Sequence, residues 1–367
     1  MYTIANIRPF GHNVGNTAIS FALRNKLYEH FGRFVTIIDY PATARYENNA
    51  KAGITKQTVY EINRFADGVI VGGGNLYENN EIEVDATALA NLRPPLMLFS
   101  NSRGRIYGRD QKLQERTDVI PDSKLDNLVN AALISASRDS ATHEYIKSRG
   151  GSDVIGYCPT IALGKYQNLL PVLPQGEHVG ALISIRTPSL MNLPISQQSL
   201  VSKQIETAIV ALKETGHERV RILCNDSRDL DFAVQFKGSL SVDPVYTNDV
   251  YQYLSMLTRC SMLVSYRLHA TLPAISYGKP VVNITYDERA ESLCTDLGVQ
   301  KHSIKMVDPK LDSNARIDEM IRSGGYMSAL DSERISRWEN IAMHQDELLN
   351  EFKLAVSRYV TSLKAIT

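Results

Sequence analysis

Short apolar runs recur along this chain, and a glycine-rich or polar turn and a helical stretch follow most of them. Val179–Ile185 precedes a turn at Arg186 and a helical stretch from about Gln197 to Thr215. Runs that stay apolar throughout, without alternating polar residues, are typical of parallel strands buried on both faces. The repeated strand, turn and helix order therefore predicts an α/β fold with helices on both faces of a parallel sheet.

The same order appears twice, once in each half of the chain. The expected strands are Tyr2–Arg8, Phe34–Asp39, a run beginning at Asp67, Leu96–Ser100, Ala131–Ser135 and Asp153–Tyr157 in the first half, and Val179–Ile185, Val220–Cys224, Met262–Val264 and a run after Pro280 in the second. Between the halves, Leu170–Glu177 has two prolines and a glycine, no clear periodicity, and the composition of a linker. We predict domains at 1–169 and 178–330.

The C-terminal part, residues 331–367, is expected to be one long helix that returns to the first domain. From about Ser332 to Leu363, apolar residues recur at helical spacing, including Trp338, Phe352 and Val356. Such a stripe is more often buried core than a partner surface.

Composition excludes several classes of protein. The chain has 367 residues, 43% hydrophobic and 22% charged, and its 40 Lys and Arg balance 40 Asp and Glu. This balance gives no reason to expect nucleic acid as a partner. No apolar run approaches the roughly 18 residues of a membrane span, and no N-terminal signal pattern is present. We expect a cytoplasmic protein.

The four cysteines, Cys158, Cys224, Cys260 and Cys294, are widely spaced and form no CxxC pair. They are expected to be reduced thiols in or near apolar cores, in preference to a disulfide or a zinc site.

The strongest candidate site is the junction between the strand ending near Val264 and the helix from about Leu268 to Tyr277. Arg267 and His269 lie at this junction. In an α/β protein it is at the carboxyl edge of the sheet, where helix N–H groups favour anions. The other reading of His269 is a hydrogen-bonded structural residue at a helix start.

Two glycine loops in the first half follow strands and are also candidates. Gly11-His-Asn-Val-Gly-Asn16 lacks the GxGxxG fingerprint of dinucleotide-binding proteins. It either brings backbone close to a ligand or forms a tight turn capped by Asn13. Three glycines at 72–74 run into Asn75, and we expect this backbone to approach a polar ligand closely.

Two polar segments have two readings each. Arg103 and Arg105 are either solvated or an anion-facing arm. Asp226, Asp229 and Asp231 follow a strand end and suggest a metal site, although acids are common at helix starts.

Several of these motifs together resemble the polysaccharide pyruvyl transferase family over roughly residues 7–290. They are the Gly11–Asn16 loop, Gly72–Asn75, the turn at Arg138-Asp139, and above all Ser265 to His269 followed by Gly278, Pro280, Tyr286 and Asp287. Two departures are that Ser140 follows Arg138-Asp139 at once and that Cys158-Pro159 replaces Asp-Pro. The resemblance implies two Rossmann-like domains facing a cleft, as in GT-B glycosyltransferases, and transfer of the enolpyruvyl group of phosphoenolpyruvate to a sugar as a pyruvate ketal.

Phosphoenolpyruvate carries a phosphate and a carboxylate, which arginine binds well with its planar fork. We therefore expect a donor site of Arg186, Arg267, Leu268 and His269. Arg267 and His269 are the catalytic pair, with His269 moving a proton. The acceptor side is assigned to Asn16, Gly73, Gly74 and Asn75.

The scheme needs no cofactor and no metal. The expected partners are phosphoenolpyruvate and a saccharide acceptor, free or lipid-linked, handled in the cytoplasm or at the inner face of the membrane. Two alternatives stay open: a GT-B-like glycosyltransferase that uses a nucleotide sugar, and a non-catalytic protein of polysaccharide assembly. The sequence does not indicate an oligomeric state.

Overall fold

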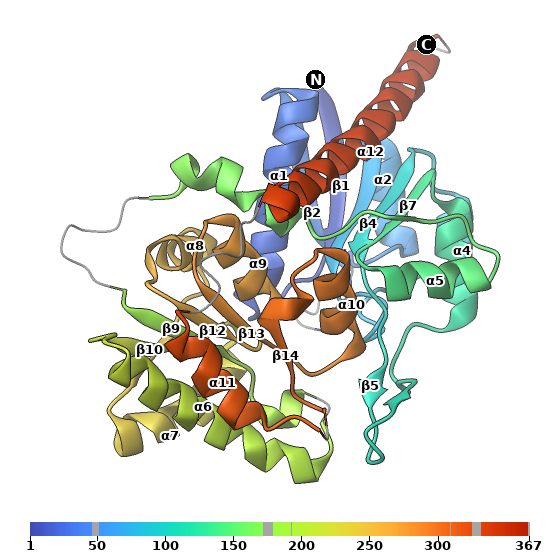
Figure 1. Ribbon diagram of the computed structural model, residues 1–367. Helices are drawn as coiled ribbons and strands as arrows, with labels where there is room; N and C mark the ends of the chain where they lie inside the picture. The colour runs from blue at the N-terminus through green and yellow to red at the C-terminus, as the bar shows by residue number, and fades with distance from the viewer. Residues whose placement is uncertain (46–50, 172–178, 192, 309, 325–331, 366–367) are drawn as a thin grey trace.

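A computed structural model describes residues 1–45, 51–171, 179–191, 193–308, 310–324 and 332–365. It contains two parallel sheets of six strands each (Figure 1). In spatial order, the first sheet consists of β2 (Val35–Pro41), β1 (Tyr2–Arg8), β3 (Gly68–Gly74), β4 (Leu96–Asn101), β7 (Ile134–Ser137) and β8 (Val154–Ile155). The second consists of β11 (Asp243–Tyr246), β10 (Val220–Cys224), β9 (Ala181–Ile185), β12 (Leu263–Ser265), β13 (Val281–Thr285) and β14 (Ser303–Lys305). We call the parts around these sheets the first and second lobes.

Helices cover both faces of each sheet, as the apolar strands require. The first lobe contains α1 (Val14–Phe31), α2 (Lys56–Phe65), α3 (Ala86–Ala90), α4 (Asp122–Ala131) and α5 (Ser140–Ser148), followed by the 3-10 segment η1 (Pro159–Leu169). The second contains α6 (Ile195–Glu214), α7 (Leu230–Leu240), α8 (Val250–Arg259), α9 (Leu268–Ser276), α10 (Glu288–Asp296) and α11 (Ser313–Arg322), with short 3-10 turns η2 (Pro188–Leu190), η3 (Ser227–Asp229) and η4 (Gln300–His302). The α/β fold of two Rossmann-like lobes in a GT-B-like arrangement is confirmed.

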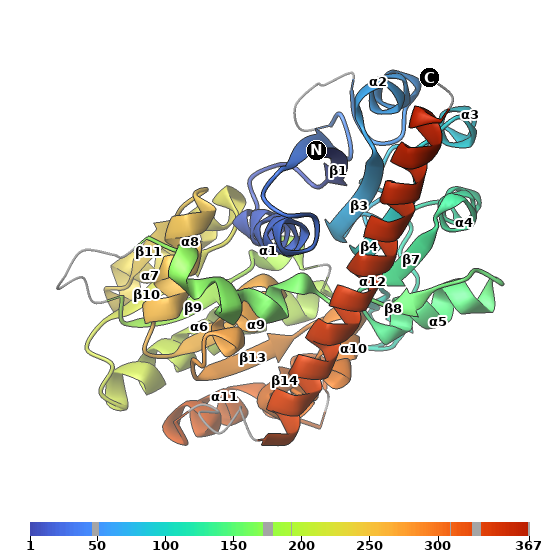
Figure 2. The same cartoon turned by 90° about the horizontal axis from the view of Figure 1, so that it is seen from above.

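The last helix, α12 (Ser332–Lys364), leaves the second lobe and crosses the first sheet, as Figures 1 and 2 show from two sides. Near its start, Trp338 donates a hydrogen bond from Nε1 to the Leu297 carbonyl oxygen at 3.0 Å. Further along, Leu349, Phe352 and Val356 are fully buried against the first sheet. Helical spacing of three and four places these side chains on one face. The prediction that the C-terminal helix returns to the first domain is confirmed.

The two lobes share a hydrophobic core. Val14, Ala18 and Ile19 of α1 pack in one buried cluster with Leu254 of α8 and Leu272 of α9. A loop of the first lobe also carries the antiparallel hairpin β5 (Ile106–Tyr107) and β6 (Leu113–Gln114). Tyr107 on this hairpin is buried within the core of the second lobe. These apolar contacts fix the lobes against each other more firmly than a polar interface would.

Most predicted elements appear with small shifts at their ends. The strand predicted at Ala131–Ser135 is wrong in its start, because α4 extends to Ala131 and Ile134 is the first residue paired with β4. Ile335, an apolar residue near the start of α12, is 42% exposed. Most of the predicted linker, residues 172–177, lies outside the described residues, and the domain boundaries stay a prediction.

All four cysteines are buried as free thiols, as expected for residues of apolar cores. Within the described residues, no helix combines the length and apolarity needed to cross a membrane.

Candidate active site

A pocket lies between the carboxyl edges of the two sheets. Its lining comes from both lobes: Asn13, Asn75, Glu78, Asn79, Arg116 and Arg138 from the first, and Arg186, Leu190, Met191, Asn225, Tyr266, Arg267, Leu268, His269, Tyr286, Asp287, Arg289 and Ala290 from the second. Five arginines face two carboxylates and one imidazole in this lining. The edge where parallel strands end is the usual ligand site of such sheets.

Arg267 is held in the turn between β12 and α9. The Ser265 hydroxyl accepts a hydrogen bond from the Arg267 N–H at 3.0 Å and donates one to its carbonyl at 2.9 Å. The guanidinium donates through Nε to the Ile185 carbonyl at 2.9 Å and forms an ion pair with Asp229. Arg267 is therefore held in one orientation from behind, with its remaining N–H groups available to the pocket.

Arg186 follows β9 directly and lies beside Arg267 in the pocket. Its Nη1 contacts Asp226 Oδ2 at 3.4 Å, and its Nε donates to the Leu190 carbonyl at 3.3 Å. Burial and the charge of Arg267 lower the pKa of Arg186 to about 10, so it remains protonated at neutral pH.

Two of the three acids suggested as a metal site, Asp226 and Asp229, contact these arginines, whereas Asp231 is exposed in the first turn of α7. Burial alone would raise the pKa of Asp226, but hydrogen bonds from Arg228 and nearby positive charge outweigh it and lower this pKa to about 2. Asp229 binds Arg267, and the described residues include no cluster of three or more His, Cys, Asp or Glu able to hold a metal ion. Asp226 and Asp229 position the arginines.

His269 lies in the first turn of α9 and lines the same pocket. Burial, followed by the charges of Arg138, Arg289 and Arg267, lowers its pKa well below 6.5. The imidazole is therefore neutral at pH 7, and its buried Nδ1 has no hydrogen-bond partner among the described residues. A neutral ring with a free nitrogen is suited to accept a proton or a ligand hydrogen bond.

The first glycine loop fits against this histidine. A Cβ atom added to Gly15 would lie 2.7 Å from the Cβ of His269. Asn13 caps α1 by accepting a hydrogen bond from the Gly15 N–H at 3.0 Å, and it also lines the pocket. Gly15 thus allows α1 of the first lobe to approach His269 of the second lobe. Of the two interpretations of this glycine loop, the contacts support the tight turn capped by Asn13.

The second glycine loop is largely structural. Gly73 and Gly74 have φ angles of +70° and +107°, and a Cβ on Gly73 would lie 2.2 Å from Cγ2 of Ile19 in α1. Neither glycine lines the pocket, and Asn16 does not line it either. Of the four residues assigned to the acceptor side, the structure brings Asn75 alone to the pocket, where Arg138 Nη1 donates to its Oδ1 at 3.4 Å.

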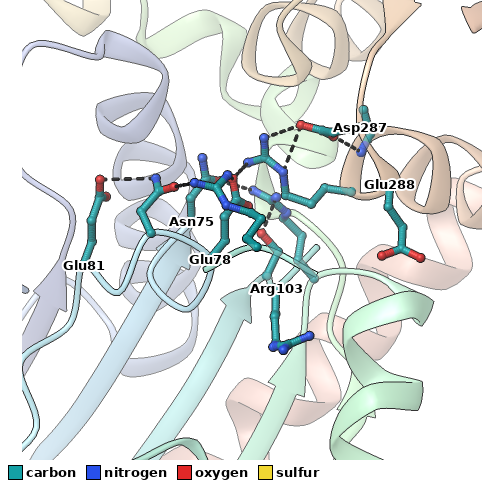
Figure 3. A network of polar contacts seen from close by, with 12 residues as sticks. Asn75, Glu78, Glu81, Arg103, Asp287 and Glu288 are labelled. Atoms are coloured by element: carbon teal, nitrogen blue, oxygen red, sulfur yellow. Dashed lines mark hydrogen bonds and ion pairs between the residues drawn. The ribbon is translucent and has the colours of Figure 1, made fainter. Parts of the chain in front are cut away.

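Five charged pocket residues are not among the donor and acceptor residues expected from the sequence: Glu78, Arg116, Arg138, Asp287 and Arg289. Figure 3 shows a network of polar contacts with Asn75 and Glu78 on one side and Asp287 on the other. Arg138 is fully buried directly after β7 and donates to the Ser102 hydroxyl. Its position after a strand is the signal that could have identified it, because Arg186 occupies the same kind of position.

Glu78 connects the lobes at the pocket. Its Oε1 lies 2.7 Å from Nη1 of Arg289 on α10 and 3.2 Å from Nη1 of Arg116. Burial raises the pKa of Glu78 to about 7. The positive charges of Arg289, Arg116 and Arg138 lower this pKa and the negative charge of Asp287 raises it, but burial is the largest effect. A carboxyl group in this state gains and loses a proton near neutral pH.

Arg103 and Arg105 were predicted to be either solvated or an anion-facing arm. Neither lines the pocket. Arg103 pairs with Glu115 at 2.9 Å and lies over the ring of Tyr145, 3.6 Å from its centroid. Arg105 forms an ion pair with Glu288 of the second lobe. Both arginines support the structure, and Arg105 holds the two lobes together.

Comparisons with solved structures agree with this fold. The UDP-N-acetylglucosamine 2-epimerase of Rickettsia bellii is 10% identical, with a TM-score of 0.59 and 98% of each chain covered. A co-structure of S. aureus MnaA with UDP is 14% identical, with a TM-score of 0.55 and coverage of 95% of this chain and 97% of that one. At these identities the likeness shows the fold alone. No curated protein matches the chain in sequence.

One protein-family model, described as polysaccharide pyruvyl transferase, matches residues 122–288. The matched stretch runs from α4 to the first residue of α10 and includes Arg138, Arg186, Arg267 and His269. The resemblance predicted from the motifs is confirmed over residues 122–288, where this chain carries the sequence pattern of the polysaccharide pyruvyl transferase family.

Proposed function

We propose that this protein transfers the enolpyruvyl group of phosphoenolpyruvate to a sugar of a cell-surface glycan precursor, forming a pyruvate ketal. The observation that carries the proposal is the paired guanidinium groups of Arg186 and Arg267, both held from behind by buried carboxylates at the edge of the pocket. Preorganised arginines of this kind suit a small ligand with two anionic groups.

The start of α9 adds to this anion site. Arg267 occupies the N-cap position, and no side chain of the described residues caps the helix there. The N–H groups of the first turn, at Leu268 and His269, therefore favour an anion through the helix dipole as well as by hydrogen bonding. Arg138 enters the same pocket from the first lobe, so a bound donor would contact positive groups of both lobes.

The pocket has room for a small donor. Its volume is about 90 Å³, whereas one buried water needs about 10–15 Å³. A phosphate and a carboxylate on a short carbon skeleton are compatible with that space.

The reaction forms one C–H bond and two C–O bonds, converts the carbon–carbon double bond to a single bond, and breaks the C–O bond to phosphate. The methylene carbon of the donor gains a proton as a sugar hydroxyl attacks the adjacent carbon and loses its own proton. A second hydroxyl then attacks the same carbon, and phosphate leaves. A neutral His269 is suited to accept the proton of the attacking hydroxyl, and Asn75 is our candidate contact for the acceptor sugar.

The scheme uses no cofactor and no metal. We extend the proposal to an acceptor that is free or lipid-linked, in the cytoplasm or at the inner face of the membrane. A nucleotide-sugar reaction is the second candidate, because the S. aureus neighbour was solved with UDP. A non-catalytic role in polysaccharide assembly is the third.

Donor binding separates these candidates. We expect phosphoenolpyruvate to raise the melting temperature of the protein and UDP-sugars to leave it unchanged, because a ligand of the folded state stabilises it. A shift with UDP-sugars alone would favour the nucleotide-sugar candidate, and a shift with neither would favour the assembly role.

Turnover tests the site. With phosphoenolpyruvate and a panel of glycosides, we expect phosphate release and a product carrying the mass of the pyruvate adduct. Arg267→Ala and His269→Ala should abolish both signals, whereas Arg149→Ala is the control, since Arg149 pairs with acids on α4 away from the pocket. Unchanged phosphate release in both pocket variants would contradict our assignment.

A further inference from the structure

The carboxyl group of Glu78 is buried yet lines the pocket. Glu78 is 1% exposed and lies in the loop that follows β3. Both guanidinium groups that bind it, from Arg289 and Arg116, contact the same oxygen, Oε1. The other oxygen, Oε2, is buried and has no hydrogen-bond partner among the described residues.

This asymmetry locates the proton of a neutral Glu78. Oε1 receives N–H donors from two arginines and is the poorer position for a hydrogen atom. Oε2 is left without a partner, and a buried polar atom in that condition costs free energy until something satisfies it. A proton on Oε2 converts that oxygen into a hydrogen-bond donor.

Glu78 and His269 are perturbed in opposite directions. Burial raises the pKa of Glu78 to about 7, whereas burial and three arginines lower the pKa of His269 well below 6.5. Glu78 comes from the first lobe and His269 from the second, and both line the one pocket. Two titratable groups shifted apart in this way are the usual sign of an acid and a base with separate roles.

We infer that Glu78 donates the proton to the methylene carbon of the donor, while His269 accepts the proton of the attacking sugar hydroxyl. The inference rests on the proposed function and divides its two proton transfers between the lobes. In the first step, a C–H bond forms at the methylene carbon as the carbon–carbon double bond is lost. A C–O bond forms at the adjacent carbon, leaving Glu78 ionised and His269 protonated.

The second step restores both groups. The second sugar hydroxyl attacks and gives its proton to the Glu78 carboxylate, and the departing phosphate takes the proton from His269. Between the steps, Arg289 and Arg116 stabilise the ionised Glu78 at Oε1. Atoms balance as one phosphoenolpyruvate and one diol giving one ketal and one phosphate.

Four charged groups face Glu78 and set its response to pH. Arg289, Arg116 and Arg138 favour its ionised form, and Asp287 favours its neutral form. Because the donor role needs the neutral carboxyl, kcat/KM should fall as pH rises above about 7. Loss of Glu78 should remove this alkaline limb.

The test compares Glu78→Gln with the wild-type protein. Gln keeps the size and an oxygen for the arginines but has no acidic proton. We expect the Kd for phosphoenolpyruvate to change by less than about threefold and kcat to fall by about 100- to 10,000-fold. Glu78→Asp should retain part of kcat and the alkaline limb, and Glu115→Gln, which alters an exposed carboxylate, should match wild type.

The outcomes distinguish this inference from the proposed function. Wild-type ketal formation with an unchanged kcat in Glu78→Gln overturns the inference alone. So does a weaker Kd with unchanged kcat, which would assign Glu78 to arginine positioning. If the wild-type protein binds phosphoenolpyruvate but forms no ketal with any glycoside in the panel, the proposed function fails and the inference fails with it.

Discussion

Replacing Asp229 by Asn should remove the ion pair that orients Arg267. Asp229 is fully buried, and both of its carboxylate oxygens accept hydrogen bonds. Oδ1 accepts from the N–H and the hydroxyl of Thr187 at 2.9 and 3.0 Å, and Oδ2 accepts from Arg267. An amide has one oxygen and one NH₂ group. Whichever way it turns, a donor meets a donor and the charge that balances Arg267 is gone.

The magnitude follows from the burial of the pair. Arg267 is 9% exposed, and removing one partner of a buried ion pair typically costs about 3–5 kcal/mol. Asn keeps the volume and one acceptor, so we expect about 3 kcal/mol, a large part of a total stability of about 5–15 kcal/mol. A misoriented guanidinium should also lose a charge-assisted hydrogen bond to the proposed donor, phosphoenolpyruvate, worth about 1.5–3 kcal/mol, which is roughly a tenfold to hundredfold increase in Kd.

Urea unfolding followed by circular dichroism measures the first quantity, and titration with phosphoenolpyruvate measures the second. Asp231→Asn is the matched control, because Asp231 is an exposed acid in the first turn of α7. Its loss should cost less than about 1 kcal/mol and leave binding unchanged. If Asp229→Asn costs no more than this control and binds the donor normally, then Asp229 does not support Arg267 as we argue.

Three further substitutions test the fold and its response to pH. Gly73→Ala should lower the free energy of unfolding in urea by about 2–5 kcal/mol, because the backbone has a positive φ and the new methyl group would also clash with α1. Gly150→Ala is the control. Gly150 also has a positive φ, +81°, but open space around it, so this change should cost only about 1–2 kcal/mol. Phe352→Ala should cost about 3–5 kcal/mol by the same measurement, because its ring is fully buried, and Leu354→Ala, at 57% exposure, should cost less than about 0.5 kcal/mol. Burial raises the pKa of Asp139 to about 6, so its stabilising contribution is present below its unfolded pKa of about 4 and is lost as pH rises through 6. Asp139→Asn should remove this loss of about 2–3 kcal/mol between pH 4 and 8, and an identical pH dependence in both proteins would contradict the assigned burial effect.

The sheets could be predicted because buried parallel strands consist of uninterrupted apolar residues. β1 and β10 lie at the residues expected. The same logic predicted the second-lobe side of the pocket, since Arg186 and Arg267 each lie just after a strand and parallel strands end at one edge. For Arg186 and Arg267, a position just after a strand was enough to predict that the side chain lies at the pocket.

The first-lobe side depends on long-range packing, which a local pattern does not reveal. The glycines at 73 and 74 suggested a ligand, but the neighbour they accommodate is α1 with its loop, and that contact follows from how the helix lies on the sheet. Arg116 and Arg289 reach Glu78 only because the chain folds back through the hairpin and the second lobe. Neither residue lies directly after a strand of the main sheets, so no signal in the sequence identified them.

The hairpin also has a consequence for engineering. Tyr107 belongs to the first lobe by sequence, yet its ring occupies the core of the second, where its hydroxyl donates to Glu291 Oε1 at 2.7 Å. A chimera that kept the second lobe and took its first lobe from a relative would lose this ring and leave a cavity in the remaining core. The two halves of the chain are thus not interchangeable modules, and a chimera would have to keep residues 105–114 with the second lobe.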